Sequence, residues 1–256
     1  MTQTRPAEAA ASAWLASMEL LARALPGGMC EADGSGTSLL VTGAPLASVN
    51  AVVDVNATPQ PERIGALAKR AAEELSVPWS IQVRAEPGAE LTAIAAELGR
   101  TATSLHPFMI KELDDRGTDR PAPGELLLRP VDGRESDAYV AALAAGFEAP
   151  AEIMRKMGCP ELLDLPGAAA YLAEVDGAAV GTALAFRSDD CVGVFNISVA
   201  PAYRGRGYGA AVTAAAVSAE RDRGARTAYL HSSPMGLPVY ESLGFRTVEH
   251  WTHFTA

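Results

Sequence analysis

The feature that most constrains this chain is an apolar run, an arginine/glycine loop and an alanine-rich segment in direct succession. The run, 192–199, is rich in β-branched residues and is typical of a buried strand, whereas 210–223 has helical composition. Glycines in the loop can adopt positive φ and bring backbone N–H groups together, and a helix N-terminus adds partial positive charge. The pattern therefore predicts a site for a phosphate-bearing ligand. Its residues are Arg204, Gly205, Arg206, Gly207, Tyr208 and Gly209.

Two interpretations of this loop compete. Gly205-x-Gly207-x-x-Ala210 matches a dinucleotide fingerprint, but four residues separate it from the strand, and no acidic residue ends the next strand, 227–231. The alternative is Arg204-x-x-Gly207-x-Gly209, followed by Tyr240-Glu-Ser-Leu-Gly-Phe245. Together these two motifs resemble the GNAT superfamily of acyl-CoA-dependent N-acetyltransferases, over about residues 125–256.

The resemblance implies an α+β fold in α/β/α layers, with a mixed, mostly antiparallel central sheet flanked by helices. It implies that the loop holds the pyrophosphate of acetyl-CoA, which is the acyl donor. Backbone N–H groups of Ile197, Ser198 and Val199 are expected to face the acyl oxygen. Ser233 stands where the family often has an asparagine beside the pantetheine arm, although it is equally suited to cap a helix ahead of Pro234.

The expected catalytic residues are Tyr240 and Glu148. The resemblance makes Tyr240 the acid that serves the leaving sulfur, while an aromatic anchor between helix and sheet is the alternative. No carboxylate lies between Cys191 and Ala219, so the base must come from elsewhere, and Glu148 is the candidate after the first helix of this half. His231, Glu249 or a chain of waters are alternatives. His250 and His253 would face opposite sides of a strand, so no metal site is expected.

The first half of the chain repeats the predicted order of helices and strands in the second half, which suggests a tandem arrangement. Its loop equivalent to the arginine/glycine loop is Asn56-Ala-Thr-Pro-Gln-Pro61, which has no glycine or arginine. Its two prolines also remove backbone donors. We therefore expect residues 1–115 to be a degenerate domain that does not bind acetyl-CoA, 116–124 to be a linker, and 125–256 to be the acetyltransferase domain.

Composition narrows the partners. The net charge of −10 argues against nucleic acid and anionic membranes. Three cysteines without CxxC spacing fit a reducing cytoplasm, and neither a signal peptide nor a transmembrane run is expected. The predicted function is acetyl transfer to a primary amine of a small molecule or peptide. The alternative is an acyl-CoA-binding sensor or partner-binding module without turnover; a homodimer is left open.

Overall fold

The computed structural model describes residues 6–114 and 123–256, which form two compact units. We call residues 14–108 with 247–256 the N-terminal unit, and residues 6–13 with 109–246 the C-terminal unit. Residues 247–256, at the end of the second half, belong to the N-terminal unit, and residues 6–13 belong to the C-terminal unit. The predicted domains, 1–115 and 125–256, are instead continuous in sequence. The predicted linker, 116–124, lies outside the described residues except for Pro123 and Gly124.

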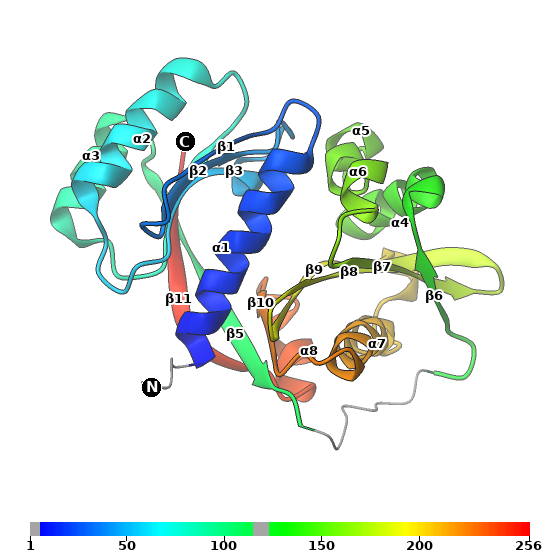
Figure 1. The fold of residues 1–256 in the computed structure, drawn as a ribbon. Helices are drawn as coiled ribbons and strands as arrows, with labels where there is room; N and C mark the ends of the chain where they lie inside the picture. The colour runs from blue at the N-terminus through cyan, green and yellow to red at the C-terminus, as the bar shows by residue number, and fades with distance from the viewer. Residues whose placement is uncertain (1–5, 115–122) are drawn as a thin grey trace. The chain divides into compact units, whose positions relative to one another are not determined.

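The N-terminal unit contains, in chain order, α1 (Pro6–Ala24, from residue 14), β1 (Met29–Ala32), β2 (Thr37–Val41), β3 (Asn50–Asp54), α2 (Pro61–Glu74), β4 (Ser80–Val83), α3 (Gly88–Glu97), most of β5 (Ala102–Glu112) and most of β11 (Arg246–Thr255). Strands β1 to β4 and β11 are neighbours in that order, and only β3 and β4 run parallel. Helices α2 and α3 cover one face (Figure 1). On the other face, Ser38 of β2 donates a hydrogen bond to Glu19 of α1 at 2.7 Å.

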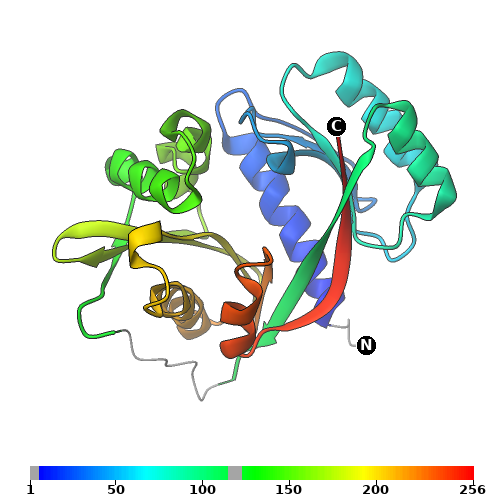
Figure 2. The same ribbon diagram turned by 180° about the vertical axis from the view of Figure 1, so that it is seen from behind.

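The C-terminal unit contains β6 (Leu127–Val131), α4 (Ser136–Phe147), α5 (Ala151–Met154), α6 (Pro160–Leu163), β7 (Ala168–Val175), β8 (Ala178–Ser188), β9 (Cys191–Val199), α7 (Tyr208–Asp222), β10 (Thr227–His231) and α8 (Leu237–Ser242). Strands β6 to β10 are neighbours in sequence order, and only β9 and β10 run parallel. Helices α4 to α6 lie on one face of this sheet and α7 with α8 on the other (Figures 1 and 2).

The predicted fold class is confirmed, because each unit is a mixed, mostly antiparallel sheet flanked by helices. Both units share one pattern. A strand that pairs with its predecessor in antiparallel fashion is followed in the chain by a long helix and then by a strand that pairs parallel to it. In the N-terminal unit these are β3, α2 and β4, and in the C-terminal unit β9, α7 and β10. The Asp176–Gly177 turn between β7 and β8 has positive φ at both residues, as predicted for a two-residue hairpin. Sequence patterns missed β1 and α6, which are only four residues long.

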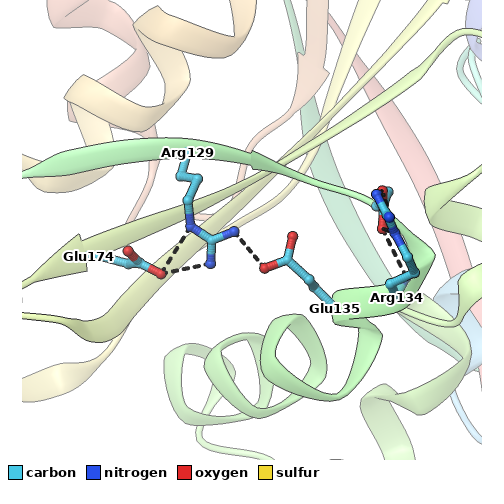
Figure 3. A network of polar contacts seen from close by, with 5 residues as sticks. Arg129, Arg134, Glu135 and Glu174 are labelled. Atoms are coloured by element: carbon cyan, nitrogen blue, oxygen red, sulfur yellow. Dashed lines mark hydrogen bonds and ion pairs between the residues drawn. The ribbon is translucent and has the colours of Figure 1, made fainter.

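Strand β6 is the outer strand of the C-terminal sheet, and a network of charges lies on it. The guanidinium of Arg129 binds Glu174 of β7 at 2.9 Å and also the carboxylate of Glu135, as Figure 3 shows. These two carboxylates raise the pKa of Arg129. Because Pro130 lacks a backbone N–H and charged side chains resist strand addition, this edge is protected from pairing with another chain. Among the described helices, none combines the length and hydropathy that crossing a bilayer requires.

We expect acidification to destabilise the N-terminal unit through His253. This side chain is 7% exposed and stacks on His106 of β5, with ring centroids 4.0 Å apart. Burial, aided by the charge of His106, lowers the pKa of His253 to about 3. The unfolded chain accepts a proton near pH 6.5 that the folded chain excludes, so stability present above pH 6.5 is lost as the pH falls towards 3.

Between pH 7.5 and pH 5 this group should reduce the free energy of unfolding by about 2 kcal/mol, which lowers Tm by roughly 4–8 °C. Thermal unfolding followed by circular dichroism at both pH values measures the difference. The difference should shrink in His253→Phe and persist in His250→Gln, which alters an exposed histidine of the same strand. Equal pH sensitivity of parent and His253→Phe would contradict the assignment.

Candidate functional site

The site is built where strands β9 and β10 separate. They pair over three residue pairs, from Cys191 with Thr227 to Gly193 with Tyr229. Beyond these pairs β9 continues to Val199 and β10 to His231. Adjacent strands that part leave backbone N–H and C=O groups without a ladder partner, so this edge of β9 can bind a ligand. The predicted donors Ile197, Ser198 and Val199 lie in this section of β9.

A bulge in β9 sets the direction of this section. Asn196 and Ile197 together oppose one residue of β8, Ala183, and Asn196 has a left-handed backbone with φ of 52°. Asparagine tolerates this conformation better than most residues. The bulge reorients the backbone before Ile197, and it was not predicted from the sequence.

Side-chain hydrogen bonds hold the bulge. Asn196 Nδ2 donates to the carbonyl of Met157 at 2.7 Å, and Thr182 Oγ1 donates to the Asn196 carbonyl at 2.7 Å. Because that bond uses the only proton of Thr182, the 2.8 Å contact with Ser198 Oγ has Ser198 as donor. Tyr139 of α4 is fully buried beside this group, and burial raises the pKa of its hydroxyl, an effect that Asn196 and Thr182 partly oppose. The sequence signal that could have revealed this hydrogen-bonded group is the presence of the polar residues Thr182, Asn196 and Ser198 within otherwise apolar strands.

The loop after β9 has the geometry expected of an anion cradle. Gly205 and Gly207 have φ of 77° and 83°, and α7 begins at Tyr208. The first helical donor bonded to the loop is Ala211, whose N–H reaches the carbonyl of Gly207 at 3.0 Å. Within the described residues the N–H groups of 205–210 have no backbone acceptor. Six donors at a helix N-terminus suit a pyrophosphate, and the cradle residues therefore fit the implied donor.

Of the two loop arginines, one is bound to the protein and one is exposed. Arg204 donates to the carbonyls of Val199 and Gly146 and to Glu148, at 3.0, 2.8 and 2.7 Å. Glu148, the predicted base, is thus ion-paired; it follows α4 with φ of 54°. Arg206 lies over the ring of Tyr203, 5.4 Å from its centroid, with one 3.4 Å hydrogen bond to Ala202.

The other predicted site residues lie on α7 and around α8. Tyr208 is buried and its hydroxyl donates to Glu125, which raises its pKa. Tyr240 of α8 is 9% exposed, packs edge-on against Phe245 at 6.1 Å, and has its pKa raised to about 12 by burial. Ser233 Oγ accepts the N–H of Gly236 at 3.1 Å, so it caps the turn that leads into α8.

Of the alternative bases, Glu249 lies in the N-terminal unit and accepts from Arg84 at 2.8 Å and from Trp251 at 2.9 Å. These bonds give it a structural role within that unit. His231 lies at the end of β10, two residues beyond the last pair with β9. Glu148 and His231 therefore remain the two candidate bases in the C-terminal unit.

In the N-terminal unit a carboxylate occupies the position equivalent to the cradle. Asp54, at the end of β3, accepts the N–H groups of Asn56 and Gln60 at 2.7 and 3.1 Å, and the hydroxyl of Thr37 at 3.1 Å. Its side chain is 1% exposed. An internal anion thus takes the loop donors that a phosphate would need. That the first half does not bind acetyl-CoA stays a prediction.

Comparison with known proteins identifies related folds. The family described as acetyltransferase (GNAT) domain matches residues 166–247. A GCN5-related N-acetyltransferase from Kribbella flavida is similar over 97% of this chain and 95% of its own, with 20% identity and a TM-score of 0.69. A functionally unknown conserved protein from Staphylococcus epidermidis is similar over 88% and 92%, with 12% identity and a TM-score of 0.63. A GCN5-related N-acetyltransferase from Sphaerobacter thermophilus is similar over 98% of this chain and 92% of its own, with 18% identity and a TM-score of 0.54.

A search of curated proteins finds no match. The structural likenesses extend over nearly the whole chain, and at such identities they concern the fold alone. The family match concerns the second half, where both sequence motifs lie.

We expect Asn196→Ala to destabilise the C-terminal unit more than Asn196→Gly. Both remove the hydrogen bond to Met157, but only alanine is strained at the positive φ of this position, which costs about 1 kcal/mol beyond the lost bond. Urea unfolding of the three proteins measures the two losses separately. If alanine and glycine reduce the free energy of unfolding equally, the left-handed conformation is not what asparagine supplies.

Proposed function

We propose that the protein transfers the acetyl group of acetyl-CoA to a primary amine of a small molecule or peptide. The match of residues 166–247 to the acetyltransferase (GNAT) domain family supports this proposal. The observation that carries the proposal is the cradle at 205–210, at the N-terminus of a 15-residue helix, whose N–H groups have no backbone acceptor in the part of the chain that the structure describes. An unpaired set of donors at this place is explained by a phosphorylated ligand. The net charge of −10 favours a cationic acceptor.

The proposed donor site has two parts. The cradle amides and an arginine bind the phosphates, and the unpaired edge of β9 receives the acyl arm between β9 and β10. Gly205 and Gly207 serve the cradle because a side chain at positive φ would be strained. Ser233 caps its turn with Oγ and so contributes to the shape of the loop before α8.

Transfer requires an amine to attack the acyl carbon, an N–C bond to form and the C–S bond to break. Backbone N–H groups between Ile197 and Val199 stabilise the oxyanion of the tetrahedral intermediate. Tyr240 supports the leaving sulfur. With its pKa raised to about 12, Tyr240 stays protonated at neutral pH. Full proton transfer to a thiolate with a pKa near 8.5 is uphill by about 5 kcal/mol, so Tyr240 acts mainly by donating a hydrogen bond to sulfur.

Glu148 is the proposed base that takes the proton lost by the amine, directly or through water, and the sulfur is protonated from solvent. In the ligand-free chain Glu148 is bound to Arg204 at 2.7 Å, so the ion pair fixes the carboxylate beside the donor loop. His231 is the alternative base. The three cysteines are free, which suits the cytoplasmic location that we propose.

The N-terminal unit is proposed to support the fold without binding a second donor, since Asp54 takes the loop amides there. We expect one CoA to bind per chain. A GNAT-fold binder without turnover is the second candidate, because Glu148, the proposed base, is already ion-paired with Arg204.

Binding of the acyl donor is tested by thermal unfolding. CoA and acetyl-CoA at a hundredfold excess over Kd should stabilise the chain by about 2.7 kcal/mol and raise Tm by roughly 5–10 °C, while NAD should have no effect. Gly207→Asp should abolish the shift, because a carboxylate then occupies the anion site in a strained backbone. Gly224→Asp is the matched control, since Gly224 also has positive φ and lies at the opposite end of α7. No shift with CoA in the parent would refute the proposed function.

Removal of the Tyr240 hydroxyl tests its role at the leaving sulfur. Tyr240→Phe should keep CoA affinity within about twofold and lower kcat for thiol release by roughly 10²-fold, since removal of one hydrogen-bond donor to developing charge costs about 10²–10³-fold. The assay follows free thiol from acetyl-CoA with amines drawn from amino acids, polyamines, aminoglycosides and peptides. Tyr203→Phe provides a control hydroxyl near the same loop. Equal kcat in parent and Tyr240→Phe would rule out the hydrogen bond to sulfur and leave Tyr240 the role of packing against Phe245.

A further inference from the structure

Arg204 joins three segments of the C-terminal unit. Its Nε donates to the carbonyl of Val199, one terminal nitrogen donates to the carbonyl of Gly146, and the other binds the carboxylate of Glu148. Val199 ends β9, and Gly146 with Glu148 ends α4. All three guanidinium nitrogens therefore have protein acceptors in the ligand-free chain.

The two carbonyls are groups that regular structure leaves without donors. Gly146 lies in the last turn of α4, where carbonyls have no helical N–H to accept, and a cation there also interacts favourably with the helix dipole. The carbonyl of Val199 ends its strand. A planar guanidinium can reach several acceptors in fixed directions, which an ammonium group cannot.

The contact that Arg204 joins is close. A Cβ on Gly146 would lie 2.4 Å from Cβ and Oγ of Ser198 and 3.1 Å from the backbone nitrogen of Val199. The end of α4 thus lies directly against the section of β9 proposed to hold the acyl group. A change in this contact would move Ser198 and Val199.

Arg206 has the opposite surroundings. Its side chain is exposed, and among the described residues no carboxylate forms an ion pair with it. It stacks over Tyr203 and lies between Gly205 and Gly207, at the centre of the cradle. A guanidinium in this state can bind phosphate without breaking a protein ion pair.

We infer that the two arginines of the loop divide their roles: Arg204 is a positioning residue that joins the end of α4 to the end of β9, and Arg206 binds the phosphates together with the cradle amides. The role of Arg206 in this inference rests on the proposed function, whereas the role of Arg204 rests on its contacts within the protein. It assigns Arg204 a role other than the phosphate binding expected from its place in the motif.

The test compares glutamine and lysine at both positions in the full chain. Without ligand, Arg204→Gln should lower Tm by at least about 3 °C and Arg204→Lys should not restore it, because lysine cannot reach three separate acceptors. Arg206→Gln should leave Tm within about 1 °C, since its side chain is exposed and its hydrogen bond to the carbonyl of Ala202 is 3.4 Å long.

CoA titrations at low and high KCl give the second readout. Arg206→Gln should weaken CoA binding about tenfold and flatten its salt dependence, and Arg206→Lys should recover most of both, because lysine serves phosphate as a point charge. Arg204→Gln should keep the parent's salt dependence. With acetyl-CoA saturating, Arg204→Gln should lower kcat while KM for acetyl-CoA stays within about threefold, which a loss of phosphate binding would not produce.

Two results would overturn the inference. One is an Arg204→Gln variant that melts with the parent while its CoA affinity loses salt dependence; the other is an Arg206→Gln variant that binds CoA as the parent does. If the parent binds no CoA at all, the proposed function fails, and the ligand-free melting of the Arg204 variants still decides whether Arg204 joins α4 to β9.

Discussion

The candidate site depends on the separation of two parallel strands. β9 and β10 pair over three residue pairs, and from there the bulge at Asn196 turns β9 away from its regular ladder. A backbone left without ladder partners inside a unit is unfavourable unless something else meets it. The hydrogen bonds of Thr182 and Asn196 fix the bulge, and the contact of α4 fixes the strand end. The chain thereby keeps an open edge that does not collapse into continuous pairing.

A strand, a loop and a long helix followed by a parallel strand occur twice in this chain, and the two loops differ. In the C-terminal unit the loop after β9 contains glycines with positive φ, and among the described residues the N–H groups of 205–210 have no backbone acceptor. In the N-terminal unit the loop after β3 carries prolines, and the buried Asp54 accepts its N–H groups. Helix α2 begins at Pro61 after Gln60, whereas α7 begins after Gly207 at positive φ. The pairing also differs: β3 pairs with β4 up to Asp54, its last residue, whereas β9 continues to Val199 beyond its last pair at Gly193. The two halves therefore differ both in the chemistry of the loop and in the pairing of the strand before it.

Much of the fold could be predicted from periodicity and turn chemistry. The composition and periodicity of residues 136–147 and 168–175 account for the helix and the strand found there, and the Asp176–Gly177 turn follows because only a few dipeptides favour positive φ twice. Very short elements such as β1 and α6 carry too few residues for a periodic signal. Nor can periodicity show that residues 247–256 belong with the N-terminal unit, since strand pairing over long sequence separation leaves no local pattern.

The sequence by itself determined which residues are available for chemistry: the glycines and arginines of one loop, a tyrosine before Gly244-Phe245, and a first half with prolines in place of glycines. It could do so because positive φ and missing N–H groups are properties of single residues. Only the tertiary structure decided what those residues contact. Arg204 and Arg206 are two positions apart and chemically identical in the sequence. One is enclosed by Val199, Gly146 and Glu148, and the other is exposed, because α4 packs against the end of β9 and provides acceptors for the first alone.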